Sequence, residues 1–199
     1  MYAFKYQPAS RNDEDLDHVP EFKAIVDGIV DQAKTILDIG WRLDTYSLEF
    51  PSHMAKQGIK MTILDAFEQN INNLRAQNPD PNFIFPVLAD ARQFIKETDQ
   101  KWDVCIWQGG PEHVLLEEFA EFLIEADKKI DTMIIATPNG LWPQDALGGN
   151  VYEKHISTWT VDTYTRFGFR CILWQPGQPG SPDRTLGIIG YRVNPSKKT

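Results

Sequence analysis

Three apolar runs, each ending in a carboxylate or a glycine, constrain the fold of this chain more than any other feature. The first run is Thr35 to Gly40, and comparable runs follow at Met61 to Asp65 and at Phe83 to Asp90. Short apolar runs with polar boundaries are typical of buried strands. In an open α/β sheet, parallel strands end at one shared edge, where ligands bind. The pattern therefore predicts an α/β protein whose site suits a ligand with several separated polar groups, such as a nucleoside.

Helical patterns alternate with the predicted strands, in five rounds of strand and helix or in four with a loose fourth connection. This alternation favours a mainly parallel sheet with right-handed crossovers and helices on both faces. The last two strands are expected to close the sheet in antiparallel fashion. Later strands are predicted at 102–107, 131–137, 169–174 and 186–193, and helices at 21–33, 45–57, 68–77, 112–129 and 159–167.

One domain is expected, because 199 residues suffice for a single core. We assign it to residues 21–193, after a polar lead-in at 1–20 and before a tail at 194–199. Residues 139–159 show little periodicity and are predicted to form a lid over the site. The lid residues expected to contact substrate are Trp142, Tyr152, His155 and Trp159.

The net charge of −8 disfavours bulk nucleic acid as a partner, because a phosphate backbone would repel such a surface. A solvated acidic surface that keeps the protein soluble is the simpler explanation of this charge. Cys105 and Cys171 fall within predicted strands without a CxxC motif, which fits buried thiols in a reducing compartment. The first residues do not resemble a signal peptide, and no run is long enough for a membrane span. We therefore expect a cytoplasmic protein that does not act at a membrane.

The strand ends supply the candidate ligand-binding residues. Gly40 permits close approach of a ligand to the backbone, and Asp38 is placed to orient this loop or to meet a cationic group. Asp65 stands where carboxylates bind ribose hydroxyls in nucleotide-binding folds. Asp90 and the amide of Ala91 offer an acceptor and a donor that suit the edge of an adenine. The competing interpretation is that Asp65 and Asp90 are only turn or helix-cap residues.

In these motifs the chain resembles the class I S-adenosylmethionine-dependent methyltransferases, which have a three-layer, Rossmann-like, seven-stranded sheet. Ile36 to Gly40 resembles the first motif of the family, and Leu64-Asp65 resembles the ribose-binding end of the second strand. Ala89 to Ala91 resembles the adenine-contacting turn. Trp102 to Gln108 resembles the fourth motif, after which residues approach the methyl group. The resemblance implies S-adenosylmethionine as cofactor and a binding set of Asp38, Gly40, Asp44, Asp65, Ala66, Asp90, Ala91, Gln108 and Gly109.

One departure from the family lies in the first loop, where glycines usually follow two and four residues after the first. Arg42 and Asp44 stand there instead, and they narrow the space for the methionine end of the cofactor. Asp44 is placed to hold the amino group of the cofactor. Further along, Glu112-His113 stands where many relatives carry a Glu-His pair. The lid is similar to that of a bacterial branch of the family, in which it touches the acceptor.

Methyl transfer from a sulfonium is a direct displacement, so a base is needed only when the acceptor must lose a proton. His113 and His155 are the candidates, because histidine titrates near neutral pH. The alternative for His113 is a hydrogen bond to a neighbouring carboxylate such as Glu112 or Glu117, and for His155 it is packing within the lid. The lid aromatics are expected either to stack on a planar acceptor or to exclude water. No spacing such as HxxxH or HExxH indicates a metal site.

Three functions compete at this point. The first is methyl transfer to a small molecule or a protein, with nitrogen, oxygen, carbon and sulfur all possible as the acceptor atom. The second is a non-catalytic sensor or scaffold on the same fold, which Arg42 and Asp44 favour. The third, a nicotinamide-dependent oxidoreductase, requires a GxGxxG motif that Gly40 to Thr45 does not provide. Whether the protein is a monomer or a homodimer is left open by the sequence.

Overall fold

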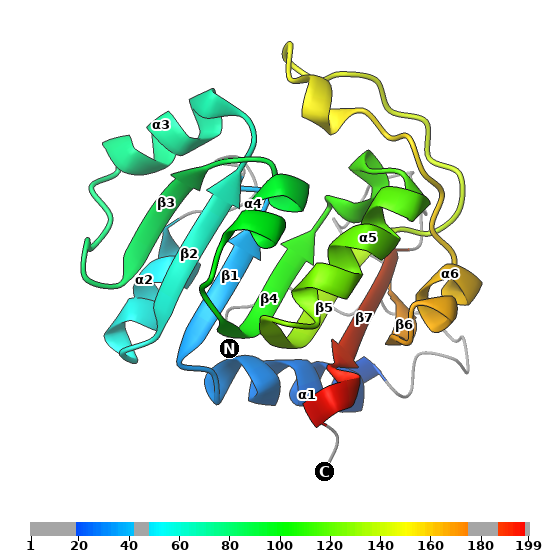
Figure 1. Cartoon of the computed structure of the whole chain (residues 1–199), viewed down its shortest axis with the longest axis horizontal. Helices are drawn as coiled ribbons and strands as arrows, with labels where there is room; N and C mark the ends of the chain where they lie inside the picture. Colours follow the sequence, from blue (N-terminus) through cyan, green and yellow to red (C-terminus); the bar gives the residue numbers. More distant parts are fainter. Residues whose placement is uncertain (1–18, 42–47, 175–186, 198–199) are drawn as a thin grey trace.

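The computed structural model describes residues 19–41, 48–174 and 187–197. These residues alternate between strands and helices around one seven-stranded sheet (Figure 1). The strands are β1 (Thr35–Ile39), β2 (Lys60–Asp65), β3 (Ile84–Leu88), β4 (Trp102–Gln108), β5 (Ile130–Pro138), β6 (Arg170–Trp174) and β7 (Gly187–Val193). The helices are α1 (Val19–Asp31), α2 (Glu49–Lys56), α3 (Glu68–Ala76), α4 (Ala91–Glu97), α5 (Leu116–Ala126) and α6 (Val161–Arg166), with short 3-10 turns η2 (Pro111–His113), η3 (Val151–Glu153) and η4 (Pro195–Lys197).

The strand order is β3-β2-β1-β4-β5-β7-β6. β1 pairs in parallel with β2 and β4, and the parallel arrangement extends to β3 on one side and β5 on the other. β7 runs antiparallel to both β5 and β6. The predicted fold, a mainly parallel seven-stranded sheet with an antiparallel last strand, is therefore confirmed. The parallel strands all end at the upper edge of the sheet in Figure 1.

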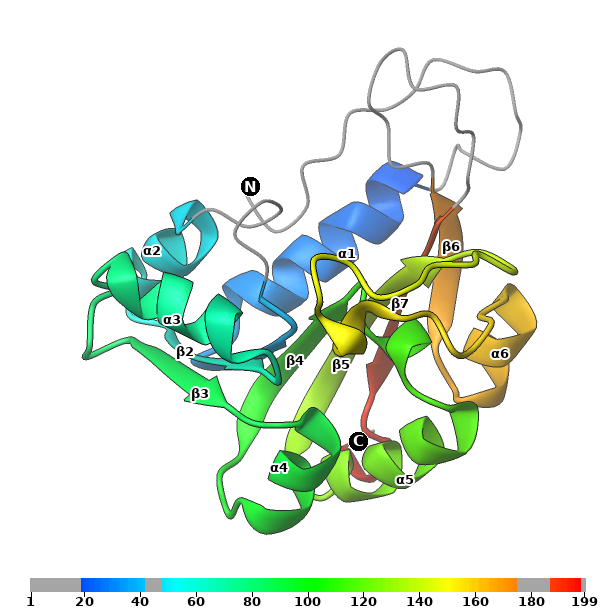
Figure 2. The ribbon, with the colours of Figure 1, turned by 90° about the horizontal axis from the view of Figure 1, so that it is seen from above.

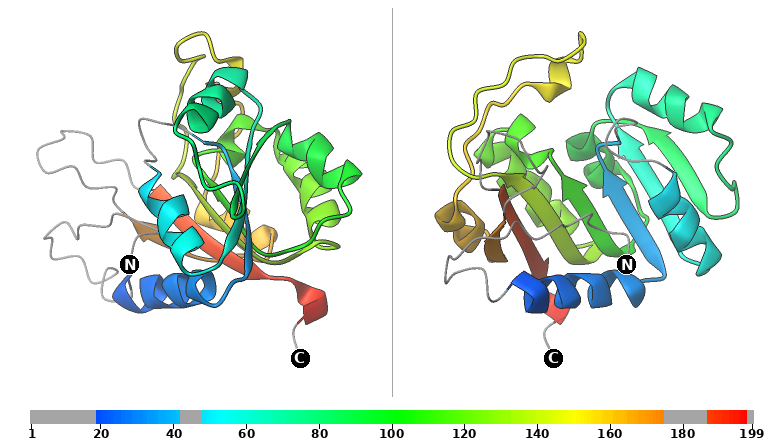
Figure 3. Two further views of the ribbon diagram at one scale, coloured as in Figure 1. Left: turned by 90° about the vertical axis from the view of Figure 1, so that its left-hand side faces the viewer. Right: turned by 180° about the vertical axis from the view of Figure 1, so that it is seen from behind.

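The helices form two layers that enclose the sheet, as the side view in Figure 3 shows. Residues of α4, α5 and α6 share one core with one face of the sheet, and residues of α1, α2 and α3 share the other. Along β4, Cys105 and Trp107 face the first core while Val104 and Ile106 face the second. Because both faces are covered, the central strands are mainly apolar on both faces, with Asp38 of β1 among the exceptions.

Two helices begin later than the sequence predicted. The helix predicted at 112–129 is divided into the turn η2 and α5, and a carboxylate oxygen of Glu118 accepts from the amide of Leu115 to fix the start of α5. The helix predicted at 159–167 begins at Val161, because Thr160 caps it and accepts from the amide of Thr163 at 3.3 Å. In both places a hydrogen bond to the first turn sets the boundary.

Several predictions fall on residues outside the described ranges. These are Arg42 and Asp44 of the first loop, nearly all of the lead-in at 1–20, the start of the helix predicted at 45–57, and the loop from Gln175 to Arg184.

In the predicted tail at 194–199, Asn194 is buried, and its amide donates to the carbonyl of Asp131 at 2.8 Å. In the described ranges, no helix has the length and apolar content that crossing a bilayer requires.

Candidate functional site

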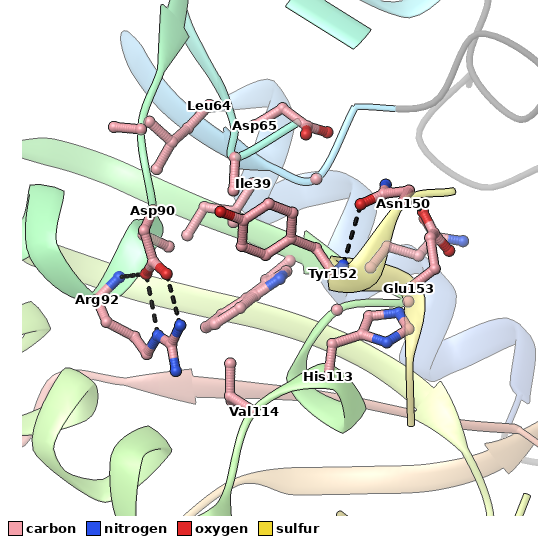
Figure 4. A pocket seen from close by; sticks show the side chains of 18 residues that line it. Ile39, Leu64, Asp65, Asp90, Arg92, His113, Val114, Asn150, Tyr152 and Glu153 are labelled. Atoms are coloured by element: carbon pink, nitrogen blue, oxygen red, sulfur yellow. Dashed lines mark hydrogen bonds and ion pairs between the residues drawn. The ribbon is translucent and has the colours of Figure 1, made fainter. Parts of the chain in front are cut away.

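A cavity opens at the carboxyl ends of the first four strands. Figure 4 shows its wall, with Asp65 and Asp90 projecting from neighbouring strand ends. The predicted site residues that line it are Gly40, Asp65, Ala66, Asp90, Ala91, Gln108, Gly109, His113 and Tyr152. Residues that the sequence analysis did not nominate complete it: Ile39, Leu64, Ala89, Arg92, Trp107, Gly110, Val114, Asn150 and Glu153.

Asp65 is 8% exposed and is held by three donors. Its Oδ1 accepts from the amide of Phe67 at 2.7 Å. Its Oδ2 accepts from the amide of Trp41 at 2.8 Å and from Nδ2 of Asn70 at 3.0 Å. Burial raises the pKa of Asp65, and these hydrogen bonds oppose the rise. A carboxylate has about four acceptor positions, so one remains for a ligand after the three protein donors.

Asp90 is the N-cap of α4 and accepts from the amide of Arg92 at 2.8 Å. The guanidinium of Arg92 also binds this carboxylate and, on its other side, reaches Oε1 of Glu118 at 2.8 Å. The hydrogen bond from the Arg92 side chain holds the pKa of Asp90 below its usual range. Asp90 therefore has the cap role that the sequence left open. The amide of Ala91 lies beside it in the first turn, where helix amides have no partner within the helix.

Two glycines give the cavity an open backbone wall. Gly40 has a φ of +86° and Gly109 a φ of +59°, which are left-handed conformations that favour glycine. Among the described residues, a β-carbon on Gly40 would meet no atom within 4 Å. Asp38, two residues earlier in β1, does not line the cavity. Burial, followed by the charge of Asp65, raises its pKa to about 7.

These groups fit a nucleoside-bearing cofactor. Asp65 offers an acceptor for ribose hydroxyls, the amide of Ala91 in the first turn of α4 offers a donor for a base, and Gly40 lines the cavity without a side chain. The side chain of Tyr152 projects from the lid into the space between Asp65 and Asp90 (Figure 4). A nucleoside entering that space must either displace the tyrosine ring or stack on it.

The lid is a two-limbed segment that leaves the end of β5 and returns before α6. Its ends meet where the amide of Gly140 donates to the carbonyl of Trp159 at 2.7 Å. Between the limbs, Nε2 of Gln144 donates to the carbonyl of Glu153 at 2.7 Å, and the amide of His155 donates to the carbonyl of Gln144 at 3.0 Å. The view from above in Figure 2 shows this segment crossing over the carboxyl ends of β4 and β5.

The returning limb rests on the turn η2. The amides of Ile156 and Ser157 both donate to the carbonyl of Glu112, at 3.0 and 3.1 Å. Nδ1 of His113 lies 3.1 Å from the carbonyl oxygen of Lys154. His113 therefore bonds to the lid backbone, and not to the neighbouring carboxylate that the sequence offered as its alternative partner.

The two lid tryptophans do not line the cavity. Trp159 is 1% exposed and packs edge-on against Phe119, with ring centroids 4.8 Å apart. Its Nε1 donates to Oγ of Ser157 at 3.0 Å. Trp142 is partly buried, and its carbonyl oxygen lies 2.7 Å from Nδ1 of His155. Of the four lid residues predicted to contact substrate, Tyr152 alone is part of the cavity wall.

Beneath the lid, the structure gathers Glu112, His113 and His155. The two imidazole rings meet edge-on with centroids 4.9 Å apart, and Nε2 of His155 lies 4.0 Å from Oε1 of Glu112. Burial raises the pKa of Glu112 to about 8 and lowers the pKa of His113. Sequence spacing concealed this cluster, because its members come from two segments more than forty residues apart.

Comparison with known proteins gives structural relatives only. No family model matches the chain, and no curated protein matches it. Among solved structures, the methyltransferase domain of bacterial CtHen1 covers 89% of this chain and 98% of its own, at 14% identity and a TM-score of 0.56.

A SAM-dependent methyltransferase from Archaeoglobus fulgidus covers 87% of this chain and 93% of its own, at 16% identity and a TM-score of 0.55. The N-methyltransferase NodS from Bradyrhizobium japonicum WM9 covers 90% and 99%, at 14% identity and a TM-score of 0.57. At such identities the likeness establishes the fold, which is that of the class I methyltransferases.

Proposed function

We propose that this protein transfers a methyl group from S-adenosylmethionine to a small-molecule acceptor. The observation that carries the proposal is the convergence of Gly40, Asp65, Asp90 and Gly109 on one cavity at the strand ends. The chain spans nearly the whole length of the methyltransferase domain and of the two methyltransferases that it resembles. A small acceptor suits a cavity that the lid covers and a surface with a net charge of −8.

The bound cofactor supplies a sulfonium methyl group that an acceptor attacks directly, so the protein contributes mainly positioning. Asp65 binds the ribose hydroxyls through its remaining acceptor position. The amide of Ala91, beside the Asp90 cap, binds the base. Gln108 and Gly109, at the end of β4, face the methionine part, and the lid excludes water from the acceptor. For an acceptor that must lose a proton, His113 at the cavity wall is the nearer candidate base.

Isothermal titration of the full chain with S-adenosylmethionine and S-adenosylhomocysteine tests cofactor binding, with NAD as the control ligand. Asp65→Ala is expected to weaken binding of both sulfur ligands by about 1–3 kcal/mol, through loss of a charge-assisted hydrogen bond. Asp99→Ala is the matched control, because Asp99 is exposed and lies outside the cavity wall. Unchanged affinity in a folded Asp65→Ala protein would remove Asp65 from the ribose role.

Methyl transfer itself is the property that separates an enzyme from a sensor or scaffold. Incubation with S-adenosylmethionine and a panel of hydroxyl, amine and thiol acceptors, with mass spectrometry of the products, detects it. Tight cofactor binding without any product across the panel favours the non-catalytic module, which the bulky residues Arg42 and Asp44 in the first loop also favour.

A further inference from the structure

The cluster of Glu112, His113 and His155 has the composition of a metal site. Each residue offers one ligand atom, and these three atoms lie within 4.8 Å of one another. His113 is part of the cavity wall. Gly109 of the same wall lies next to the cluster, since a β-carbon there would stand 3.9 Å from Oε1 of Glu112. The cluster therefore adjoins the cavity.

Backbone carbonyls orient both imidazole rings. Nδ1 of His113 lies 3.1 Å from the carbonyl oxygen of Lys154, and Nδ1 of His155 lies 2.7 Å from that of Trp142. A carbonyl oxygen only accepts, so a neutral His155 carries its proton on Nδ1 and presents a lone pair on Nε2. The ring of His113 also bonds to the backbone of Gly109, and metal binding would replace one of its two backbone bonds. Histidines that ligate metals are oriented in this way, with the second nitrogen bound to a carbonyl or carboxylate.

The carboxyl group of Glu112 is buried, and its donors are the backbone amides of Glu112 and Gly110. The residue is 4% exposed, and its Oε2 has no hydrogen-bond partner within the described part of the chain. Oε1 lies 4.0 Å from Nε2 of His155, beyond hydrogen-bonding distance. Burying a polar oxygen without a donor or cation is costly. One ring nitrogen from each histidine and one carboxyl oxygen of Glu112 thus lie within 4.8 Å of one another.

We propose that Glu112, His113 and His155 bind one divalent first-row transition metal ion. Two imidazole nitrogens and one carboxylate are ligands that Zn²⁺, Co²⁺ or Fe²⁺ prefer, whereas Mg²⁺ and Ca²⁺ prefer oxygen. Ligand bonds of about 2.0–2.2 Å bring ligand atoms to roughly 3–3.5 Å from one another. Binding therefore draws the three side chains together by about 1 Å.

Three protein ligands leave at least one coordination position open, as in catalytic metal sites. Because His113 and Gly109 belong to the cavity wall, that position faces the cavity. A metal ion there would bind an acceptor oxygen and lower the pKa of its hydroxyl, whose proton would pass to solvent. His113 would then be a ligand and would not act as the base. This use of the ion rests on the proposed function and selects hydroxyl-bearing acceptors, but metal binding itself does not depend on the cofactor.

The test is a titration of the metal-free full chain with Co²⁺, followed by visible absorption, with Zn²⁺ as competitor and Mg²⁺ as the hard-cation control. We expect one Co²⁺ per chain, displacement by Zn²⁺ and no displacement by Mg²⁺. His155→Ala and Glu112→Gln should each weaken Co²⁺ binding at least tenfold. His53→Ala is the matched control, since His53 lies on α2 outside the cluster, and its binding should equal that of the unaltered protein.

Absence of a Co²⁺ spectrum, or equal binding in His53→Ala and Glu112→Gln, would overturn the metal site. Circular dichroism checks that each variant is folded, and Glu112→Gln, which preserves the shape of the side chain, decides the question where His155→Ala is not folded. The titration contains no cofactor, so its failure is separate from failure of cofactor binding. Cofactor binding by the metal-free protein together with a negative Co²⁺ titration overturns the metal site alone.

Discussion

The two sides of the cavity are built in different ways. On the side of β2 and β3, each key carboxylate bonds to an amide two residues further along the chain, as Asp65 does with Phe67 and Asp90 with Arg92. On the side of β4 and β5, the turn η2 bonds to lid residues more than forty positions away, as His113 does with Lys154. The first side thus rests mainly on bonds within short stretches of chain, with the amide of Trp41 as a more distant donor to Asp65. The second side is held by bonds between η2 and the lid.

The largest expected effect on stability concerns Trp159, at the C-terminal end of the lid. Trp159→Ala should lower the free energy of unfolding by about 3–5 kcal/mol, because it removes a buried indole from the core around Phe119. Trp142→Ala should lower it by about 1 kcal/mol or less, because Trp142 is only partly buried. Urea unfolding of both variants measures the difference. Equal losses of stability in the two variants would mean that Trp142 and Trp159 belong to one cooperatively unfolding unit.

The next effect concerns Asp38 in β1, whose contribution to stability depends on pH. The pKa of Asp38 in the folded protein is raised to about 7, above its unfolded value near 3.8. A raised pKa contributes stability that is complete below about pH 4 and is lost as the pH rises through 7. Asp38→Asn should remove this loss and stabilise the protein at pH 8 by roughly 2–4 kcal/mol relative to the unaltered chain.

Urea unfolding of cofactor-free protein at pH 4 and pH 8 provides the measurement for Asp38→Asn. The exposed Asp99→Asn serves as control and should follow the unaltered protein at both pH values. A variant whose stability falls between pH 4 and pH 8 as steeply as that of the unaltered protein would show that Asp38 is not the group responsible.

The smallest effect is confined to the lid. Gln144→Ala removes the bond from Nε2 to the carbonyl of Glu153, which joins the two limbs at 2.7 Å. The loss of about 1 kcal/mol should raise amide hydrogen exchange of the lid about fivefold, with the strands unchanged. Gln69→Ala is the control, because its comparable bond to Asn73 lies within α3. Faster exchange in β1 or β2 of Gln144→Ala would contradict the separation of the two sides.

The same difference explains which features the sequence could predict. The strands were predictable because burial on both faces leaves apolar runs, and Asp65 and Asp90 mark where those runs end. Their roles as turn and cap residues follow from bonds to near neighbours. The lid has no period, so its sequence does not distinguish a tryptophan that fills the core from one that meets a ligand. Trp159 and Tyr152 are both aromatic, yet one is buried and the other lines the cavity.

The cluster beneath the lid was not predictable for a related reason. His155 reaches Glu112 because backbone amides of the lid bond to the carbonyl of Glu112, and a backbone bond leaves no mark on residue type. The Glu-His pair at 112–113 was noticed only through its resemblance to relatives. Once the structure places His155 beside it, the buried Oε2 of Glu112, which has no partner among the described residues, becomes the informative signal.

The adjacent ends of the lid make it exchangeable in protein engineering. Gly140 and Trp159 are bonded to each other, so a segment of different length spans the same gap at a small entropic cost, roughly 0.6 kcal/mol for each doubling of loop length. The lid is hydrogen-bonded to the turn η2 (Pro111–His113). A lid grafted from another protein therefore keeps these contacts only when the turn is transferred with it. Under the proposed function, acceptor preference would then be carried by two exchangeable parts, the lid and the turn η2, on a sheet that need not be altered.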